Sequence, residues 1–159
     1  MTAACAAHAP LLRPALPTDA GAVGDILSDF IDSTPWMPRI DTRAEDLAHA
    51  AMLVDRGWVT LAETPQADPG PRVLGFLARQ GCAIHALYLA RPARGRGIGR
   101  VLLADAQARA DRLSLWTFAA NAPAQRFYER AGFAPVERTD GENEEGLPDI
   151  RYLWERPAP

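Results

Sequence analysis

The sequence has little of what marks several classes of protein. Its 159 residues include two cysteines, Cys5 and Cys82, too few for a disulfide framework or a cysteine-ligated metal cluster. The formal net charge is −3, with 17 basic and 20 acidic residues spread along the chain, so we expect no nucleic-acid partner. Residues 1–10 lack the cationic start and apolar run of a signal peptide, and no later run approaches the roughly 18 apolar residues that span a bilayer. We therefore expect a cytoplasmic protein without membrane anchor or bound metal.

What the chain does have is enough apolar material for one core. Hydrophobic residues make up 48% of it, and 159 residues is close to the common size of a single domain. The first ten residues are small and end at Pro10, so they bury little apolar area to offset their conformational entropy. We expect a disordered tail over 1–10 and one domain over 11–159.

Hydrophobic periodicity in the first third of the chain predicts a strand and two helices. A short strand is expected at 11–13, followed by a helix from about residue 19 to 30. A second helix should start near Thr42, because Thr42 and Glu45 have the spacing of a capping box, and it should end at Gly57.

The rest of the sequence alternates between strand and helix patterns. The expected strands lie at 58–63, 72–79, 82–90, 113–118, 133–138 and 149–155, and the expected helices at 98–111 and 121–130. The first three of these strands have the spacing of an antiparallel meander, whereas the later alternation implies a mixed sheet. We expect an α/β fold with a mixed sheet of six to seven strands flanked by four helices.

A glycine-rich turn joins an expected strand directly to an expected helix. It reads Arg94-Gly95-Arg96-Gly97-Ile98-Gly99-Arg100. A helix start presents unpaired backbone N–H groups and partial positive charge, and glycines there let a pyrophosphate approach closely. The turn lacks the Gly-Lys-Ser/Thr end of a P-loop, and Arg100 occupies the last position of a Gly-x-Gly-x-x-Gly dinucleotide motif. The two interpretations left are a phosphate cradle of another kind and a plain glycine loop.

Two motifs, in order along the chain, resemble those of the GNAT superfamily of acyl-CoA-dependent N-acyltransferases. Arg94-x-x-Gly97-x-Gly99 is similar to the family's Gln/Arg-x-x-Gly-x-Gly/Ala signature, and the stretch from Asn121 through Tyr128 to Phe133 looks like its Asn-x-x-Ala-x-x-x-Tyr-x-x-x-Gly-Phe helix. The resemblance, closest to a bacterial subgroup of unassigned substrate, implies a GNAT-type fold. It also implies acetyl-CoA as co-substrate and transfer of the acetyl group to a primary amine.

The same resemblance implies roles in binding the coenzyme. The backbone of Leu87, Tyr88 and Leu89 would pair with the pantetheine arm, and the residues from Arg94 to Arg100 would hold the phosphates. Asn121 would contact pantetheine. Tyr128 would donate a proton to the departing sulfur, the alternative being a tyrosine that simply fills the core.

His85 is the expected base that takes a proton from the acceptor amine. Ile84-His85-Ala86-Leu87 resembles a strand that carries a histidine in one member of the family, and histidine exchanges protons near neutral pH. Strand alternation predicts that its side chain shares a face with Leu87 and Leu89. A water path to solvent, or a histidine satisfied within the core, are the alternatives.

The acceptor amine is expected against the aromatic and apolar residues Trp36, Met37 and Trp116, with Trp154 as a further candidate. Large aromatic residues more often fill a core, so each has that alternative. The acidic loop 140–148 is interpreted as a solvated connection.

The nature of the acceptor depends on where that acidic loop lies. If Glu144, Glu145 or Asp149 borders the groove, the acceptor should be a cation held by carboxylates. A small-molecule amine is the favoured acceptor, and the alternatives are a protein N-terminus or lysine, and a non-catalytic acyl-CoA-binding sensor module. A homodimer is a candidate assembly, because dimers are the commonest soluble oligomers.

Overall fold

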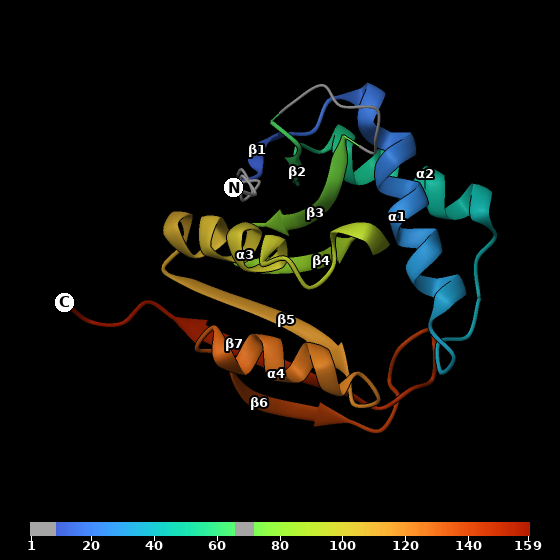
Figure 1. Cartoon of the computed structure of the whole chain (residues 1–159). Coiled ribbons are helices and arrows are strands. Elements are labelled where there is room, and N and C mark those ends of the chain that lie inside the picture. Colours follow the sequence, from blue (N-terminus) through green and yellow to red (C-terminus); the bar gives the residue numbers. More distant parts are fainter. Residues whose placement is uncertain (1–8, 66–71) are drawn as a thin grey trace, which may run out of the picture.

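A seven-stranded mixed sheet forms the centre of the protein. The computed structural model describes residues 9–65 and 72–159, so most of the expected tail, and most of the turn before the second strand of the meander, lie outside the described residues. The strands follow the order β1-β2-β3-β4-β5-β7-β6, with β4 and β5 parallel and all other pairs antiparallel (Figure 1). They are β1 (Leu11–Pro14), β2 (Val59–Glu63), β3 (Val73–Gln80), β4 (Ala83–Leu89), β5 (Arg112–Phe118), β6 (Ala134–Thr139) and β7 (Asp149–Glu155).

Four α-helices cover the sheet, as predicted. They are α1 (Ala20–Ser33), α2 (Arg43–Asp55), α3 (Ile98–Arg109) and α4 (Ala122–Arg130), with short 3-10 turns η1 (Pro17–Asp19) and η2 (Arg91–Ala93). One apolar cluster joins α1 and α2 to β2 and β3 through Val23, Leu53 and Phe76. A second joins α3 to β5 and β7 on the opposite face, through residues such as Leu102 and Tyr152. No helix among the described residues could cross a membrane.

Local sequence signals explain both N-terminal helices. Thr42 caps α2 by accepting a hydrogen bond from the Glu45 N–H (3.2 Å), and the capping box is complete as predicted. Asp19 precedes α1 but does not cap it with its side chain. Its carboxylate instead accepts hydrogen bonds from Arg13 (2.8 Å) and from the Leu16 N–H (2.7 Å), which ties β1 to the start of α1.

The strands β4 and β5 diverge in the middle of the sheet, and this positions the site. They pair at Ala83 and Ser114, where the Ser114 N–H donates to the Cys82 carbonyl (2.8 Å), and beyond this point no further β4–β5 pairing occurs in the described strands. The edge of β4 that faces β5 therefore presents unpaired backbone groups to the gap. Buried or half-buried backbone groups without partners are available to a ligand.

Candidate active site

The gap between β4 and β5 contains a small cavity of about 120 Å³. Its walls are the diverging halves of the two strands, together with α4 and its N-terminus. It is lined by Phe30, Ile84, His85, Ala86, Leu87, Tyr88, Leu115, Trp116, Thr117, Phe118, Asn121, Ala124 and Tyr128. We call it the central cavity. It brings together six residues predicted as functional: His85, Leu87, Tyr88, Trp116, Asn121 and Tyr128.

A groove runs from the central cavity to the start of α3. Leu87, Tyr88 and Leu89 line it from β4, and Arg94 and Gly99 line its far end. Gly97 is the N-cap of α3 with φ +81°, and the first helical hydrogen bond runs from Val101 N–H to the Gly97 carbonyl (3.2 Å). The N–H groups of the first three helical residues, which precede that bond, have no partner within the helix. The groove thus ends at donors suited to an anion.

Gly99 keeps this groove open. A Cβ built at Gly99 would sit 3.5 Å from the ring of Phe127 and 3.7 Å from Leu89, which are ordinary contacts, so the fold itself tolerates a Cβ atom there. Any such side chain would project into the groove, because Gly99 lines it. Gly95 and Gly97 serve a different purpose, since both have positive φ, which favours glycine.

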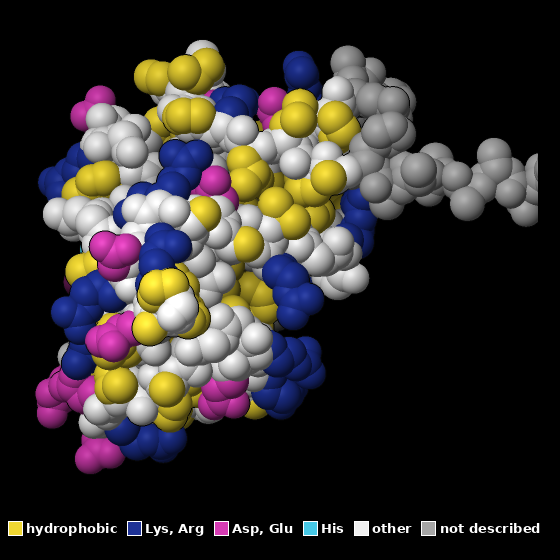
Figure 2. All heavy atoms as spheres, turned by 90° about the vertical axis from the view of Figure 1, so that its left-hand side faces the viewer, with side chains coloured by type: hydrophobic (Ala, Val, Ile, Leu, Met, Phe, Trp, Pro, Cys, Tyr) yellow, Lys and Arg dark blue, Asp and Glu magenta, His cyan; other side chains and the backbone are white. Residues whose placement is uncertain are grey.

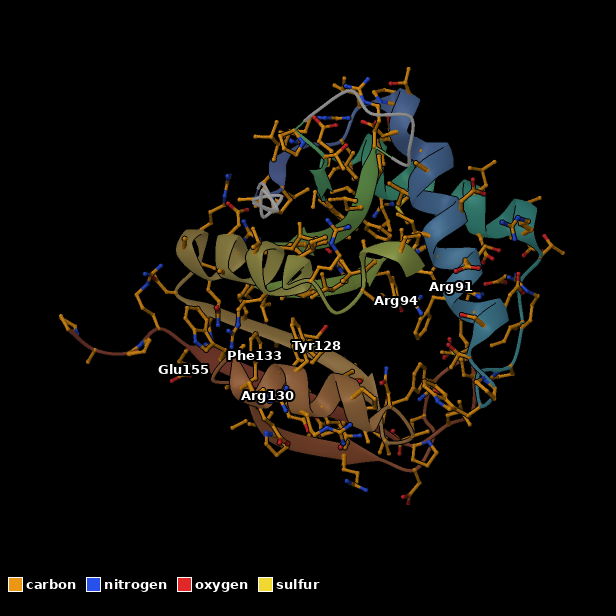
Figure 3. The ribbon with its side chains drawn as sticks, viewed as in Figure 1. Arg91, Arg94, Tyr128, Arg130, Phe133 and Glu155 are labelled. Atoms are coloured by element: carbon orange, nitrogen blue, oxygen red, sulfur yellow. The ribbon has the colours of Figure 1, made fainter. Side chains whose placement is uncertain are left out.

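The arginines around the turn are used in different ways. Arg94 points back over the groove and donates to the Leu89 carbonyl (3.4 Å), whereas Arg91 forms an ion pair with Asp29 of α1 (3.0 Å). Figure 3 shows Arg94 on the groove side of the turn and Arg91 directed to α1. Arg100 and Arg130 line a neighbouring cavity beside the glycines, from α3 and α4.

Tyr128 rises from α4 into the central cavity and the groove (Figure 3). Its ring is 8% exposed and packs edge-on against Phe127 (5.1 Å between centroids) and Phe133 (5.6 Å). No hydrogen bond from its hydroxyl is present among the described residues. Burial, and to a smaller extent Tyr88, raises the pKa of Tyr128 above that of an ordinary tyrosine. Tyr128 therefore holds a proton at neutral pH and has it free to donate.

Asn121 has a structural function in addition to the predicted one. Its side-chain oxygen accepts a hydrogen bond from the Ala124 N–H (3.1 Å), so Asn121 is the N-cap of α4. The side chain lines the central cavity together with Tyr128. The capping bond uses the amide oxygen, so the amide nitrogen remains available to a ligand in the cavity.

The prediction that His85 shares a face with Leu87 and Leu89 is wrong. Ala78 pairs with Ala86 and Arg79 with Ile84, so His85 is the extra residue of a β-bulge. The bulge places the imidazole against Trp58 (5.3 Å, stacked), with Nε2 near Gln80 Oε1 (3.1 Å). His85 is exposed, not a core residue, and it borders the central cavity.

Tyr88 contributes a side chain that the sequence reasoning missed. Only its backbone was predicted to matter, yet its ring lines the groove, the central cavity and the acceptor-side cavity described next. It packs on Phe30 (4.7 Å) and Phe76 (6.0 Å). Burial, with the charge of Glu145, raises the pKa of Tyr88 to about 12. A second protonated phenol thus lies where the three spaces meet.

A cavity of about 470 Å³ opens on the α1–α2 side of β4, and we call it the acceptor cavity. It shares His85, Ala86, Tyr88 and Phe118 with the central cavity. Five carboxylates line it: Asp41, Glu45 and Asp46 from the region around the start of α2, and Glu144 and Glu145 from the loop before β7. Asp46 forms an ion pair with Arg39 (2.8 Å). None of the other four forms an ion pair within the described residues.

The unpaired carboxylates affect one another. Partial desolvation raises the pKa of Asp41, and the charges of Glu45 and Glu144 and a hydrogen bond with Glu45 add to the shift. Like charges held close together without a cation are unfavourable. A positively charged group in the acceptor cavity would relieve this repulsion. Among the described residues there is no grouping of His, Cys, Asp and Glu that could hold a metal ion.

The four aromatic and apolar residues predicted near the acceptor lie in three different places. Trp36 stacks edge-on against Phe118 (5.6 Å), a wall of both cavities, and Met37 lines the acceptor cavity directly. Trp116 lines the central cavity and is 47% exposed. The prediction that Trp154 contacts the acceptor is wrong. Trp154 is 8% exposed, packs in the core against Phe133 (6.4 Å between centroids) and lines none of the cavities of the site.

With this geometry established, the sequence can be compared with those of known proteins. A family model described as "Acetyltransferase (GNAT) family" matches residues 32–133. The chain belongs to the GNAT acetyltransferase family. It is therefore an acetyltransferase, and the resemblance seen in the two sequence motifs is confirmed, as is the mixed α/β fold.

Three similar proteins illustrate the relationship. It is 31% identical over 131 residues to the peptidyl-lysine N-acetyltransferase YiaC of Escherichia coli K12, covering 81% of this chain and 88% of YiaC. A solution structure of the apo form of YjaB from Escherichia coli superposes with a TM-score of 0.76 at 20% identity, covering 94% of this chain and all of that one. The structure of YncA from Salmonella typhimurium with acetyl-CoA has a TM-score of 0.68 at 18% identity, covering 96% and 98%.

Acetyl-CoA is the acetyl donor of GNAT enzymes, and three features of this chain suit the groove to this ligand. The edge of β4 is unpaired where β5 diverges, the start of α3 offers free N–H groups, and Gly99 leaves space between Phe127 and Leu89. Tyr128 lines the same groove, and its hydroxyl has no hydrogen-bond partner among the described residues. The unpaired backbone groups of β4 and α3 and the phenol of Tyr128 are therefore available to a ligand in the groove.

Proposed function

We propose that this GNAT enzyme transfers the acetyl group of acetyl-CoA to the side-chain amine of lysine in polypeptides. The observation that carries the proposal is the acceptor cavity, where four carboxylates without cationic partners lie next to the central cavity. A lysine ammonium matches them in charge and its four-carbon stem matches the apolar part of the wall. That the relatives YiaC and YjaB are named peptidyl-lysine N-acetyltransferases supports the same substrate class.

The residues of the groove would hold the donor. The N–H groups at the start of α3 and the cationic side chains of Arg94 and Arg100 suit the phosphates, and the free edge of β4 at Leu87, Tyr88 and Leu89 suits the pantetheine amides. The amide nitrogen of Asn121 adds a donor at the central cavity. Acetyl-CoA supplies a thioester whose acetyl carbon forms the new C–N bond as the C–S bond breaks.

Two proton transfers must accompany this exchange, one from the amine and one to the sulfur. Tyr128 is suited to the second, because its proton is retained at neutral pH and its hydroxyl faces the groove. His85 lies on the acceptor side and borders both cavities, so it is placed to receive the proton of the amine, directly or through water. The carboxylates hold the ammonium until the proton is removed.

An acceptor panel tests the proposal. Purified enzyme and acetyl-CoA are incubated with a lysine peptide whose α-amine is blocked, a lysine-free peptide with a free α-amine, and a free diamine, and the released thiol is measured. All 17 basic residues of the enzyme are arginine, so any acetyl-lysine found by mass spectrometry comes from the substrate. We expect the blocked lysine peptide to have the highest kcat/KM. A preference for the free α-amine, or for the diamine, which represents the small-molecule amine favoured by the sequence analysis, would refute the lysine assignment.

A further inference from the structure

One face of the sheet is uncovered beside the acceptor cavity. In β5, β7 and β6 the side chains of Trp116, Arg151 and Glu137 lie in register, on the face opposite to the core residues Ile150 and Tyr152. In the described chain α1 packs on β3 and β4, and α4 lies on the other face of β5 and β7 (Figure 1). The indole of Trp116 is therefore 47% exposed on an open sheet surface.

A second cavity, of about 500 Å³, lies on this face. Trp116, Thr139, Glu142 and Asp149 line it, and it shares Phe118 and Glu145 with the acceptor cavity, so the two cavities are adjacent. We call the surface around this second cavity the flanking surface.

The carboxylates of the flanking surface differ in whether they have partners. Asp149 is buried and accepts hydrogen bonds from Thr139 and from Asn143 (3.1 Å), and Glu137 is paired with Arg151 (2.9 Å). Glu142 and Glu145 have no cationic partner in the described residues and stand beside the exposed indole. An indole face together with free carboxylates is a favourable environment for a guanidinium or ammonium group.

Charge is distributed differently elsewhere on the molecule. On the face of Figure 2, at the other end of the sheet from loops 34–42 and 140–148, arginines and carboxylates are interspersed. Around the two adjacent cavities, by contrast, the Asp, Glu and Arg side chains that lack an ion-pair partner in the described residues are all acidic: Asp41, Glu45, Glu142, Glu144 and Glu145. Charge complementarity therefore favours a polypeptide that carries more than one cation.

We propose that the flanking surface binds the acceptor polypeptide next to its target lysine and selects substrates with an arginine or lysine near that position. The proposal rests on the proposed lysine acetylation. The basic neighbour would lie against Trp116 and pair with Glu142 and Glu145, while the target lysine enters the acceptor cavity.

The test uses blocked peptides with one lysine that differ only in the residues close to it, which are arginine, alanine or glutamate. We expect kcat/KM to decrease in that order by roughly fivefold at each step at low salt, and the differences to shrink at high salt. Trp116→Ala and Glu142→Gln should each reduce the arginine-to-alanine ratio to about twofold. Glu155→Gln is the matched charge control, because Glu155 lies at the far end of β7 (Figure 3) and should leave the ratio unchanged.

The outcomes separate the two proposals. If lysine is acetylated equally well in all peptides, the flanking surface is refuted and lysine acetylation stands. If no peptide lysine is acetylated, both are refuted. Light scattering tests whether a second copy of the enzyme covers the flanking surface instead. If the wild type is a dimer and Trp116→Ala is a monomer, this face is a dimer interface and the proposal is overturned.

Discussion

Replacing Tyr128 by phenylalanine isolates the proton that the proposed mechanism needs at the sulfur. The substitution removes one oxygen atom and keeps the ring, which packs against Phe127 and Phe133. The hydroxyl makes no hydrogen bond among the described residues, so its loss breaks none there. We therefore expect the melting temperature to stay within a degree or two of the wild type, since a hydroxyl that lines a groove and makes no hydrogen bond within the protein contributes little to stability.

The expected effect is on turnover. A positioned general acid contributes about 100-fold to 10,000-fold, so kcat should fall by at least about 100-fold, equivalent to about 2.7 kcal/mol of transition-state stabilisation. The Kd for acetyl-CoA should change by less than about threefold, because the lost group acts mainly on the departing sulfur. Since the pKa of Tyr128 is raised, the proton stays on its hydroxyl at alkaline pH, and kcat should show no Tyr128-dependent fall below pH 10.

Tyr152→Phe is the matched control. Tyr152 lies 6.5 Å from Tyr128 between ring centroids, but its hydroxyl donates to Glu129 (3.0 Å) and lines none of the cavities of the site. This variant should lose about 1 kcal/mol of stability and keep its kcat. Thiol release under saturating substrates, with thermal unfolding in parallel, measures both. A Tyr128→Phe enzyme with kcat within threefold of the wild type would refute the assigned proton donor.

Three further predictions follow from other parts of the structure. Gly99→Val should raise the Kd for acetyl-CoA, measured by calorimetry, at least about tenfold with little change in melting temperature, because the added atoms enter the groove between Phe127 and Leu89. Arg13 lowers the pKa of the Asp19 carboxyl in the folded state. The stability that this pair contributes is therefore present above the unfolded-state pKa near 4 and is lost as the pH falls through the lowered folded-state pKa. The acid unfolding curve of Asp19→Asn should lack this pH-dependent loss of stability. The absence of lysine predicts that prolonged incubation with acetyl-CoA leaves internal side chains of the enzyme without acetyl-lysine, as intact mass and peptide mapping would show.

Much of the fold was predictable because local signals and periodicity agree with it. The capping box at Thr42, the meander and the glycine turn before Ile98 are all encoded by short-range patterns. The bulge at His85 was not predictable, since a period of two cannot reveal one extra residue. Trp154 was misassigned because an apolar aromatic in an edge-proximal strand can face either way until the register is known.

The residues that line the acceptor cavity could not be predicted from the sequence, because long-range geometry brings them together. Asp41 precedes the N-cap of α2, Glu45 lies in its first turn, and Glu144 and Glu145 lie in the loop before β7, yet they line one cavity. From the sequence, the loop 140–148 was interpreted as a solvated connection, because local sequence patterns do not indicate which distant residues a loop contacts. The sequence predicted a cationic acceptor on the condition that Glu144, Glu145 or Asp149 borders the groove. Glu144 and Glu145 line the acceptor cavity, so this condition is met.

The most direct test of the account is the KM for a lysine peptide in the double variant Asp41→Asn, Glu45→Gln. Both changes keep size and shape, and glutamine at position 45 keeps the capping box, so the loss is confined to charge. If the acceptor cavity holds the lysine ammonium, KM should rise at least about tenfold while the Kd for acetyl-CoA stays unchanged. An unchanged KM for the lysine peptide would contradict the account.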